Sequence, residues 1–525
     1  MGEDGYDTIV VGGGTAGIVL AARLSEDAAH RVLLVEAGGS NRNPLYRIPL
    51  GIGKLRTARG GLWRHTTEPE PHLDGRALAL GTGKVLGGSA SINGMIHMTP
   101  PAADLDRWES LGAAGWNAPS LAPAFARLDA MLAPRRAAAT HPLDRAFLAA
   151  CAGAGIARDD ALDAPHGEAA GALLFNIREG RRHSVAQAYL RPALARPNLT
   201  VMTNAEVLRI VAERGAATGI ELADAGGGPT RRLRAAHGIA IAAGALQSPK
   251  LLMLSGIGAA DALRAHGIAP LIDLPGVGGN LQNHVDVALR HACEEPVTLH
   301  SLLRAERILP AMTRAWLFGT GPATRFPGDA AAFIRTVPGE RLPDVLCHLV
   351  EGLGIRGIRW PLMRGPVDAL DREGFSCRVM LLRPESRGRV ALRSADPRDP
   401  PRVRFDYLSR ASELRRLVDG VRRMRDVFAR PEFAGLRGAE LEPGPAAQDD
   451  GALAAWIRAR ADMQCHPVGT CAMGVGADAV VDPQLRVRGL DRLRVVDAAV
   501  MPAIVGVNTF ATTVAIAERA AELMR

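Results

Sequence analysis

Short apolar runs near the N-terminus are separated by a glycine-rich turn and a helix-like segment. Ile9-Val10-Val11 is followed by Gly12-Gly13-Gly14-Thr15-Ala16-Gly17, and a second run is Val32-Leu33-Leu34-Val35-Glu36. Continuous apolar runs of this length are typical of buried parallel strands, and the apolar spacing between them is typical of a helix. Residues 7–36 are therefore predicted to form a strand–helix–strand unit.

Similar patterns return in the middle and at the end of the chain. The later strand-like runs are 199–202, 205–211, 239–242 and 493–496. Amphipathic helices are predicted within 102–155, over 411–429 and from about residue 510. Because long insertions separate the strand-rich segments, we expect a first domain that is discontinuous in sequence and a second domain built from the insertions.

Composition narrows the class of protein and its partners. At 525 residues the chain is longer than a single hydrophobic core usually holds, so two or more domains are expected. Its content of 47% hydrophobic and 22% charged residues is typical of a globular protein. The net charge is +8, but Lys and Arg form no long basic block, so no nucleic-acid partner is expected. The basic surface leaves open a peripheral contact with an anionic membrane.

Features of targeting and metal binding are not found in the sequence. The acidic start of the chain leaves no room for a signal peptide, and no apolar run reaches the roughly 18 residues of a transmembrane helix. A cytoplasmic protein, with membrane association left open, is therefore expected. The six cysteines form no C-x-x-C, and no metal site is predicted. His65, His183, His284 and His348 match no metal spacing and are interpreted as structural or surface groups.

The glycines of the first turn give the first indication of function. Gly12, Gly14 and Gly17 form G-x-G-x-x-G at the start of the predicted helix, and Glu36 directly follows the second strand. These glycines allow a tight turn, close approach of a pyrophosphate and close packing of helix on strand. The helix N-terminus favours phosphates, and Glu36 can accept hydrogen bonds from a ribose. This pattern predicts a site for an ADP-containing dinucleotide.

Several further segments resemble the glucose–methanol–choline (GMC) family of FAD-dependent oxidoreductases. The matching segments are 85–94, 244–258, 383–388, 394–397, 466–474 and 495–502. The resemblance extends over nearly the whole chain, and within the family it is greatest to bacterial choline and aliphatic-alcohol dehydrogenases.

The resemblance implies the fold class and the domain organisation. It implies an α/β fold in which a Rossmann-like FAD-binding domain is joined to an α+β substrate-binding domain with an antiparallel sheet and helices. The FAD-binding domain is predicted over 1–98, 198–290 and 462–525. The substrate-binding domain is predicted over 99–197 and 291–461.

The resemblance also implies oxidation of a primary alcohol to the aldehyde, with hydride transfer to flavin N5. His466 takes the position of the family's general base, a task that suits an imidazole because its pKa lies near neutrality. Asn508 takes the second catalytic position and would orient the substrate oxygen; its alternative role is a helix N-cap. The implied partners are a small alcohol and an electron acceptor, which is oxygen, a quinone or another carrier.

The same resemblance implies the residues that contact FAD. They are Gly12, Gly14, Thr15, Ala16, Gly17, Glu36, Ala37, Gly87, Gly88, Ser89, Asn93, Gly94, Val207, Asp497, Ala498, Asn508 and Thr509. Family members with covalent flavin carry a histidine one residue before the position of Asn93. Here Ile92 occupies that position, so non-covalent FAD is expected. Asp497 has the alternative role of capping the turn that follows it.

Other interpretations stay open at this point. Flavin-containing lyases of the hydroxynitrile-lyase type and a light-driven decarboxylase share the family's motifs, and the glycine fingerprint alone permits an NAD enzyme. The chain departs from the family pattern at 81–84, 97–101, 282–284 and 510–512, which affects the substrate pocket and the flavin entrance. No obvious acidic residue marks a cation pocket, which favours a neutral primary alcohol over choline. Cys465, beside His466, is interpreted as a small buried cysteine.

Overall fold

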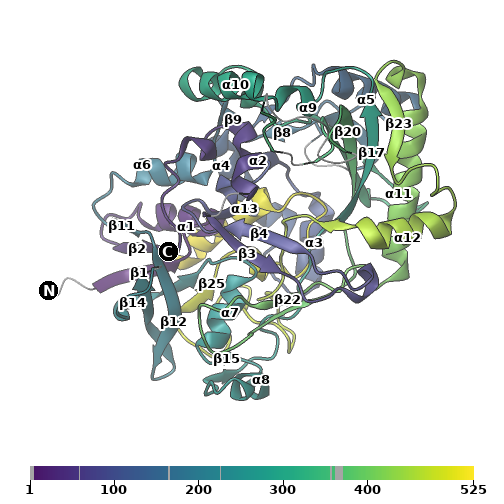
Figure 1. The fold of residues 1–525 in the computed structure, drawn as a ribbon. Coiled ribbons are helices and arrows are strands. Elements are labelled where there is room, and N and C mark those ends of the chain that lie inside the picture. The colour runs from purple at the N-terminus through teal and green to yellow at the C-terminus, as the bar shows by residue number, and fades with distance from the viewer. Residues whose placement is uncertain (1–4, 58–59, 163–165, 225, 355–356, 361–369) are drawn as a thin grey trace.

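A computed structural model describes residues 5–57, 60–162, 166–224, 226–354, 357–360 and 370–525, and two seven-stranded sheets organise it (Figure 1). The first sheet has the order β11-β2-β1-β14-β13-β12, and β25 pairs with β14. Its strands are β1 (Gly5–Val11), β2 (Val32–Val35), β11 (Leu199–Met202), β12 (Ala205–Glu213), β13 (Ala216–Asp224), β14 (Arg231–Ile241) and β25 (Leu493–Val495). β1, β2, β11, β14 and β25 run parallel, and helix α1 (Thr15–Leu24) connects β1 to β2.

The second sheet is antiparallel throughout its described pairings and has the order β23-β17-β20-β19-β18-β7, with β24 on β17. Its strands are β7 (Ala169–Ala172), β17 (Val285–Cys293), β18 (Ala330–Ile334), β19 (Val345–Val350), β20 (Gly374–Leu381), β23 (Arg437–Glu442) and β24 (Asp462–Met463). Helices α5 (Pro142–Gly153) and α11 (Ala411–Ala429) pack on this sheet. Together the two sheets confirm the predicted α/β class with an α+β part.

The remaining elements surround these sheets. The other helices are α2 (Ile52–Thr57), α3 (Ala102–Ser110), α4 (Ala118–Leu132), α6 (Arg191–Ala193), α7 (Gln247–Leu254), α8 (Ala260–Ala265), α9 (Leu299–Leu302), α10 (Ala305–Phe318), α12 (Asp450–Arg460) and α13 (Phe510–Met524). The short strands are β3 (Leu62–Thr66), β4 (Ala79–Gly83), β5 (Ile96–His97), β6 (Arg135–Arg136), β8 (Leu174–Phe175), β9 (Ile177–Arg178), β10 (Arg181–Arg182), β15 (Ile257–Gly258), β16 (Ile272–Asp273), β21 (Arg389–Ala391) and β22 (Arg402–Arg404). Among the described residues, no helix combines the length and apolarity needed to cross a bilayer.

Predicted and observed elements differ most where strands are half exposed. β14 starts at Arg231, well before the predicted run at 239–242, because its first half pairs with β13 and carries exposed arginines. Polar residues on a solvated sheet face hide the strand pattern. The domain boundaries stay a prediction; β17 of the second sheet runs across the predicted boundary at residue 290.

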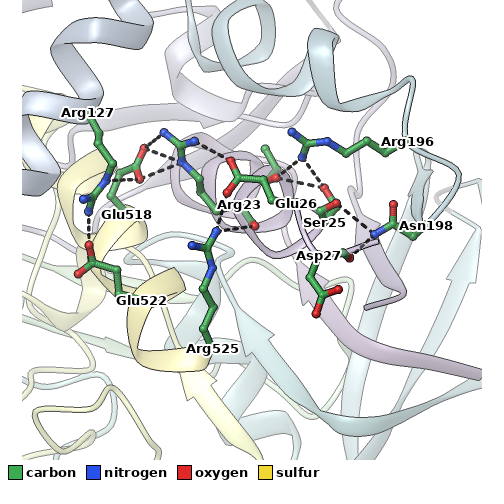
Figure 2. Close-up of polar contacts among 11 residues, drawn as sticks. Arg23, Ser25, Glu26, Asp27, Arg127, Arg196, Asn198, Glu518, Glu522 and Arg525 are labelled. Carbon is green, nitrogen blue, oxygen red and sulfur yellow. Dashed lines mark hydrogen bonds and ion pairs between the residues drawn. The ribbon is translucent and has the colours of Figure 1, made fainter. Parts of the chain in front are cut away.

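A buried carboxylate joins the C-terminal helix to the nucleotide unit (Figure 2). Glu518 of α13 accepts hydrogen bonds from Arg23 of α1 at 2.9–3.1 Å and from Arg127 of α4 at 3.1 Å. The Tyr189 hydroxyl also donates to Glu518, at 2.8 Å. The carboxylate side chain is 1% exposed, so the two guanidinium groups supply the charge that burial requires. α13 is thereby fixed against α1, and the chain just before α13 carries Asn508.

We expect Glu518→Ala to destabilise the fold strongly. The substitution leaves Arg23 and Arg127 without their buried carboxylate, and breaking such a pair costs about 3 kcal/mol of unfolding free energy. Urea unfolding followed by fluorescence measures the loss. Glu522→Ala is the matched control, because Glu522 is 36% exposed and an exposed pair is worth about 0–1 kcal/mol. Equal losses in both variants would contradict the role of burial.

Candidate active site

A cavity of about 1380 Å³ extends from the carboxyl ends of the parallel strands to one face of the antiparallel sheet. On the first sheet it is lined by the ends of β1 and β2 and by Ala242, which follows β14. On the second sheet it is lined by side chains of β17, β19 and β20, among them Arg290, His348 and Arg378. Ligands of open parallel sheets bind at this strand end.

The glycine turn after β1 is shaped for close backbone approach. Gly12 has φ +107°, and a Cβ there would lie 2.5 Å from the carbonyl oxygen of Ala242. A Cβ on Gly17 would lie 1.9 Å from the carbonyl oxygen of Gly12, so this glycine lets α1 pack on the turn. At Gly14 the nearest heavy atom would be 3.9 Å away, and Gly14 lines the cavity. α1 starts there without a side-chain cap, which leaves its first N–H groups for an anion.

Glu36 lies at the end of β2 and lines the same part of the cavity. Its carboxylate accepts hydrogen bonds from the N–H groups of Gly13 and Gly38, both at 2.8 Å. Burial raises the pKa of Glu36 to about 7. Each carboxylate oxygen keeps a second lone pair with which it can accept a ribose hydroxyl. Glycine turn, helix end and acid together fit an ADP-containing cofactor.

Most residues predicted to contact FAD line this cavity. They are Gly12, Gly14, Thr15, Ala16, Glu36, Ala37, Gly88, Ser89, Asn93, Gly94, Val207, Asp497, Ala498, Asn508 and Thr509. Gly17 and Gly87 are not among the lining residues; Gly17 packs on Gly12, and Gly87 forms a turn with φ +96°. Asp497 lines the cavity and also has the capping role that was its alternative, because it accepts from the N–H of Ala499 at 2.7 Å.

Two histidines and an asparagine meet at the junction of the two sheets. His466 Nδ1 lies 2.9 Å from His284 Nδ1, and His466 Nε2 lies 3.1 Å from Asn508 Nδ2. The backbone N–H of His466 donates to Asn283 Oδ1 at 3.0 Å, which fixes the loop that carries the imidazole. His466 and Asn508 line the cavity, whereas His284 is fully buried behind them.

Backbone carbonyls determine which nitrogen of His466 is free to act as a base. His284 Nε2 lies 3.0 Å from the carbonyl oxygen of Leu382 and 3.1 Å from that of Val505, so this nitrogen carries the proton. His284 Nδ1 is then an acceptor, and His466 Nδ1–H donates to it. The lone pair of His466 is left on Nε2, where it accepts from Asn508 and faces the cavity.

Burial keeps this pair of imidazoles neutral. Desolvation, with a smaller contribution from His284, lowers the pKa of His466 well below 6.5. Desolvation lowers the pKa of His284 to about 4. A neutral imidazole with Nε2 unprotonated is the form in which histidine accepts a proton.

Asn508 offers a second polar atom to a ligand. Its Oδ1 is buried and lacks a hydrogen-bond partner, an arrangement that a hydroxyl donor would satisfy. The alternative role as a helix N-cap is wrong, because α13 starts at Phe510 with Thr509 as its N-cap. Phe510 itself lines the cavity and makes this end of it apolar.

The antiparallel sheet places a charged pair of side chains at the same cavity. Arg378 of β20 donates from Nε and Nη2 to the two carboxylate oxygens of Asp286 of β17, and Gln464 Nε2 also donates to Asp286. Asp286 lies two residues after His284, and Gln464 lies two residues before His466, so the pair is held beside the imidazoles. Arg378 lines the cavity, while the Asp286 side chain is fully buried.

Two interpretations of single residues are corrected by the structure. Cys465 is exposed and lines the cavity, because its loop turns toward the chamber, so the interpretation as a buried cysteine is wrong. His284 is structural in its burial but contacts the proposed base directly, a contact that the sequence did not indicate. The signal available in the sequence was segment 282–284, one of those in which the chain departs from the family pattern.

Among the residues that the structure describes, one group of side chains has the spacing of metal ligands. Ligand atoms of His141, Asp144 and Glu351 lie within 4.8 Å of one another. Arg325 donates to both carboxylates and to Asp329, so a guanidinium already partners these acids. These residues are interpreted as a buried ion-pair network.

The chain is similar to known proteins over nearly its whole length. Two family models, both described as GMC oxidoreductase, match residues 6–286 and 384–517. Mitochondrial choline dehydrogenase of Mus musculus is 37% identical over 100% of this chain and 90% of the relative. Oxygen-dependent choline dehydrogenase of Brucella ovis is 36% identical over 98% of this chain and 95% of the relative. The crystal structure of pyridoxine 4-oxidase from Mesorbium loti superposes with a TM-score of 0.85 at 30% identity, covering 98% of each chain.

Proposed function

The chain belongs to the GMC oxidoreductase family, and from this premise we propose that it is an FAD-dependent enzyme that oxidises a primary alcohol to an aldehyde. The observation that carries the chemistry is the neutral His466 with its Nε2 lone pair directed at Asn508 and the cavity. The domain boundaries and site residues predicted from the sequence are part of this proposal.

The residues of the cavity are suited to hold FAD without a covalent bond. The turn at Gly12 and Gly14 with the start of α1 would bind the pyrophosphate, and Glu36 would bind the ribose. Ile92 lines the cavity and has no nucleophilic atom, which supports non-covalent binding. When bound, FAD supplies an acceptor for the hydride from the alcohol carbon at flavin N5.

The polar atoms beside the cavity can activate an alcohol. The substrate hydroxyl donates to His466 Nε2 and replaces the bond from Asn508, which leaves the Asn508 amide free to donate to the same oxygen. His466 then takes the hydroxyl proton, and His284 Nδ1 accepts from the resulting imidazolium at Nδ1–H. The amide donor stabilises negative charge on the alcohol oxygen as the proton leaves.

The cavity wall next to His466 favours an uncharged alcohol. Arg378 is neutralised by Asp286, and the charge of Asp462 is offset by Arg56, which lines the same cavity beside Cys465. This wall therefore holds no excess negative charge for a quaternary ammonium. Phe510 and Met463 add apolar surface. A primary alcohol with an apolar tail is complementary to this uncharged, partly apolar wall.

Choline and its carbon isostere test this specificity. We expect 3,3-dimethylbutan-1-ol to reduce the flavin with a kcat/KM at least about tenfold above that of choline, because the two differ only in charge and a desolvated cation without a partner loses more than 1.4 kcal/mol. Anaerobic stopped-flow absorbance measures both rates. A preference for choline contradicts the neutral-alcohol class but leaves alcohol oxidation standing.

The low pKa of His466 predicts the pH dependence. Because burial lowers this pKa below 6.5, the imidazole stays unprotonated and competent as the pH falls through 6.5. We expect kcat/KM for the alcohol to remain level from pH 8 to pH 6.5 and to decline only in more acidic solution. A decline that begins above pH 7 contradicts a desolvated base.

The overall proposal is tested by adding alcohols to the purified flavoprotein without oxygen. Bleaching of the flavin absorbance by a primary alcohol, with formation of its aldehyde, is the expected result. Turnover of a cyanohydrin with no bleaching would indicate a lyase instead. Repetition in air with peroxide detection, and then with a quinone, identifies the electron acceptor.

A further inference from the structure

Helix α10 lies at the edge of the molecule (Figure 1), and several of its large apolar side chains are exposed to solvent. Leu309, Trp316, Leu317 and Phe318 are 45%, 52%, 52% and 72% exposed. Single exposed hydrophobic residues are ordinary, but four large ones on one short helix form a patch of the kind that marks an interaction site. Trp360, 54% exposed, belongs to a segment that pairs with the residue before this helix.

The opposite face of α10 is anchored in the protein. Ile308, Ala311 and Ala315 are buried. Arg181 donates to the carbonyl oxygens of Trp316 at 3.0 Å and Leu317 at 3.4 Å, which caps the end of the helix with a cation. The exposed apolar side chains are therefore presented by a rigid helix. A shallow groove on this outer face is lined by Leu309, Pro310, Thr313, Arg314, Phe318 and Thr320.

The charges around the apolar patch are predominantly positive. Arg304 and Glu306 form an ion pair at 2.5 Å and cancel each other. Arg307 and Arg314 donate to neutral oxygens, the carbonyl of Ser301 and the hydroxyl of Thr320. Arg307 and Arg314 lie on the same side of α10 as Phe318, at one edge of its exposed face. Cations beside exposed Trp, Phe and Leu side chains are the composition of an interfacial helix on an anionic lipid surface.

The patch adjoins the large cavity. Leu309 is exposed on the outer surface and also lines the cavity, as does Trp360. Ile308 and Met312, on the inner side of α10, line the cavity too. A surface that covers the patch would therefore lie next to an apolar wall of the cavity.

We propose that α10 docks the protein on a bilayer that contains anionic phospholipids. Trp316, Leu317 and Phe318 enter the interface between headgroups and acyl chains, and Arg307 and Arg314 contact headgroup phosphates. In this orientation the apolar end of the cavity lies close to the bilayer. The docking needs only the surface of α10 and does not depend on the proposed alcohol oxidation.

Vesicle sedimentation of the full-length, FAD-loaded protein tests the proposal. We expect binding to phosphatidylcholine–phosphatidylglycerol vesicles, weaker binding to phosphatidylcholine alone, and release at high salt. W316S/F318S and R307Q/R314Q should each lower the partition constant by roughly tenfold or more. L271S/V475S is the matched control, because Leu271 and Val475 are 50% and 71% exposed outside α10; it should bind like the wild type.

A spectroscopic measurement keeps the result independent of vesicle pelleting. Phospholipids with brominated acyl chains should quench tryptophan fluorescence of the bound protein, and W316F should lose most of that quenching. The proposal is overturned if the wild type does not bind anionic vesicles or if W316S/F318S binds like the control. Conversion of a dimer to a monomer by W316S/F318S, without vesicle binding, would assign the patch to self-association and also overturn it.

Discussion

His466→Ala abolishes most flavin reduction by alcohol while FAD stays bound. A positioned general base contributes about 10²–10⁴-fold in rate, so we expect the anaerobic reduction rate constant to fall by that factor. The imidazole has its Nε2 lone pair directed at Asn508 and the cavity and its Nδ1 at His284, while the backbone N–H of His466 donates to Asn283. None of the other contacts in this set is a base at neutral pH with an atom directed at the cavity.

The control for this variant is a second buried histidine outside the cavity lining. His291 has a lowered pKa from burial and stacks on Phe375 with ring centroids 5.5 Å apart. His291→Phe keeps the stack, so its reduction rate should stay within a factor of two or three of the wild type. The absorbance of bound flavin checks cofactor content in both variants. A loss below tenfold in a flavin-loaded His466→Ala would show that another group removes the proton.

Local sequence pattern was sufficient to predict the nucleotide unit. The apolar runs that became β2 and β11 and the charged helix α11 have the predicted bounds, because buried strands and amphipathic helices are encoded by neighbouring residues. The glycine turn was predictable for the same reason, because glycine is required where a side chain would collide with the backbone of the same turn. Motif resemblance placed His466 and Asn508 together, although 42 residues separate them.

The surroundings of His466 could not be predicted from local pattern. The pairing of β17 with β24 brings His284 next to His466, which is 182 residues away. The pairing of β17 with β20 brings Arg378 onto Asp286. Lateral strand order and register determine these contacts, and periodicity reports only which face of a strand is buried. The charge near the substrate end of the cavity could therefore be determined only from the folded structure.

His284 provides the second large expected effect, although it does not line the cavity. Its Nε2–H is held by the carbonyls of Leu382 and Val505, and its Nδ1 therefore accepts from His466. This chain of bonds keeps the His466 lone pair on Nε2. Without the acceptor, His466 can shift its proton to Nε2, and the Asn508 amide can turn so that its unpartnered Oδ1 accepts that proton in place of Nδ2. The base would then be blocked in the direction of the cavity.

We expect His284→Leu to lower the rate constant of flavin reduction by about 10²-fold, because it removes the acceptor at Nδ1. His284→Asn should recover most of the rate, because the asparagine Oδ1 lies near the position of the imidazole Nδ1 and can accept the same proton. FAD content and the substrate dissociation constant, obtained from the concentration dependence of reduction, should change little in either variant. Equal losses in the Leu and Asn variants would mean that His284 acts only by filling space, and the tautomer argument would be rejected.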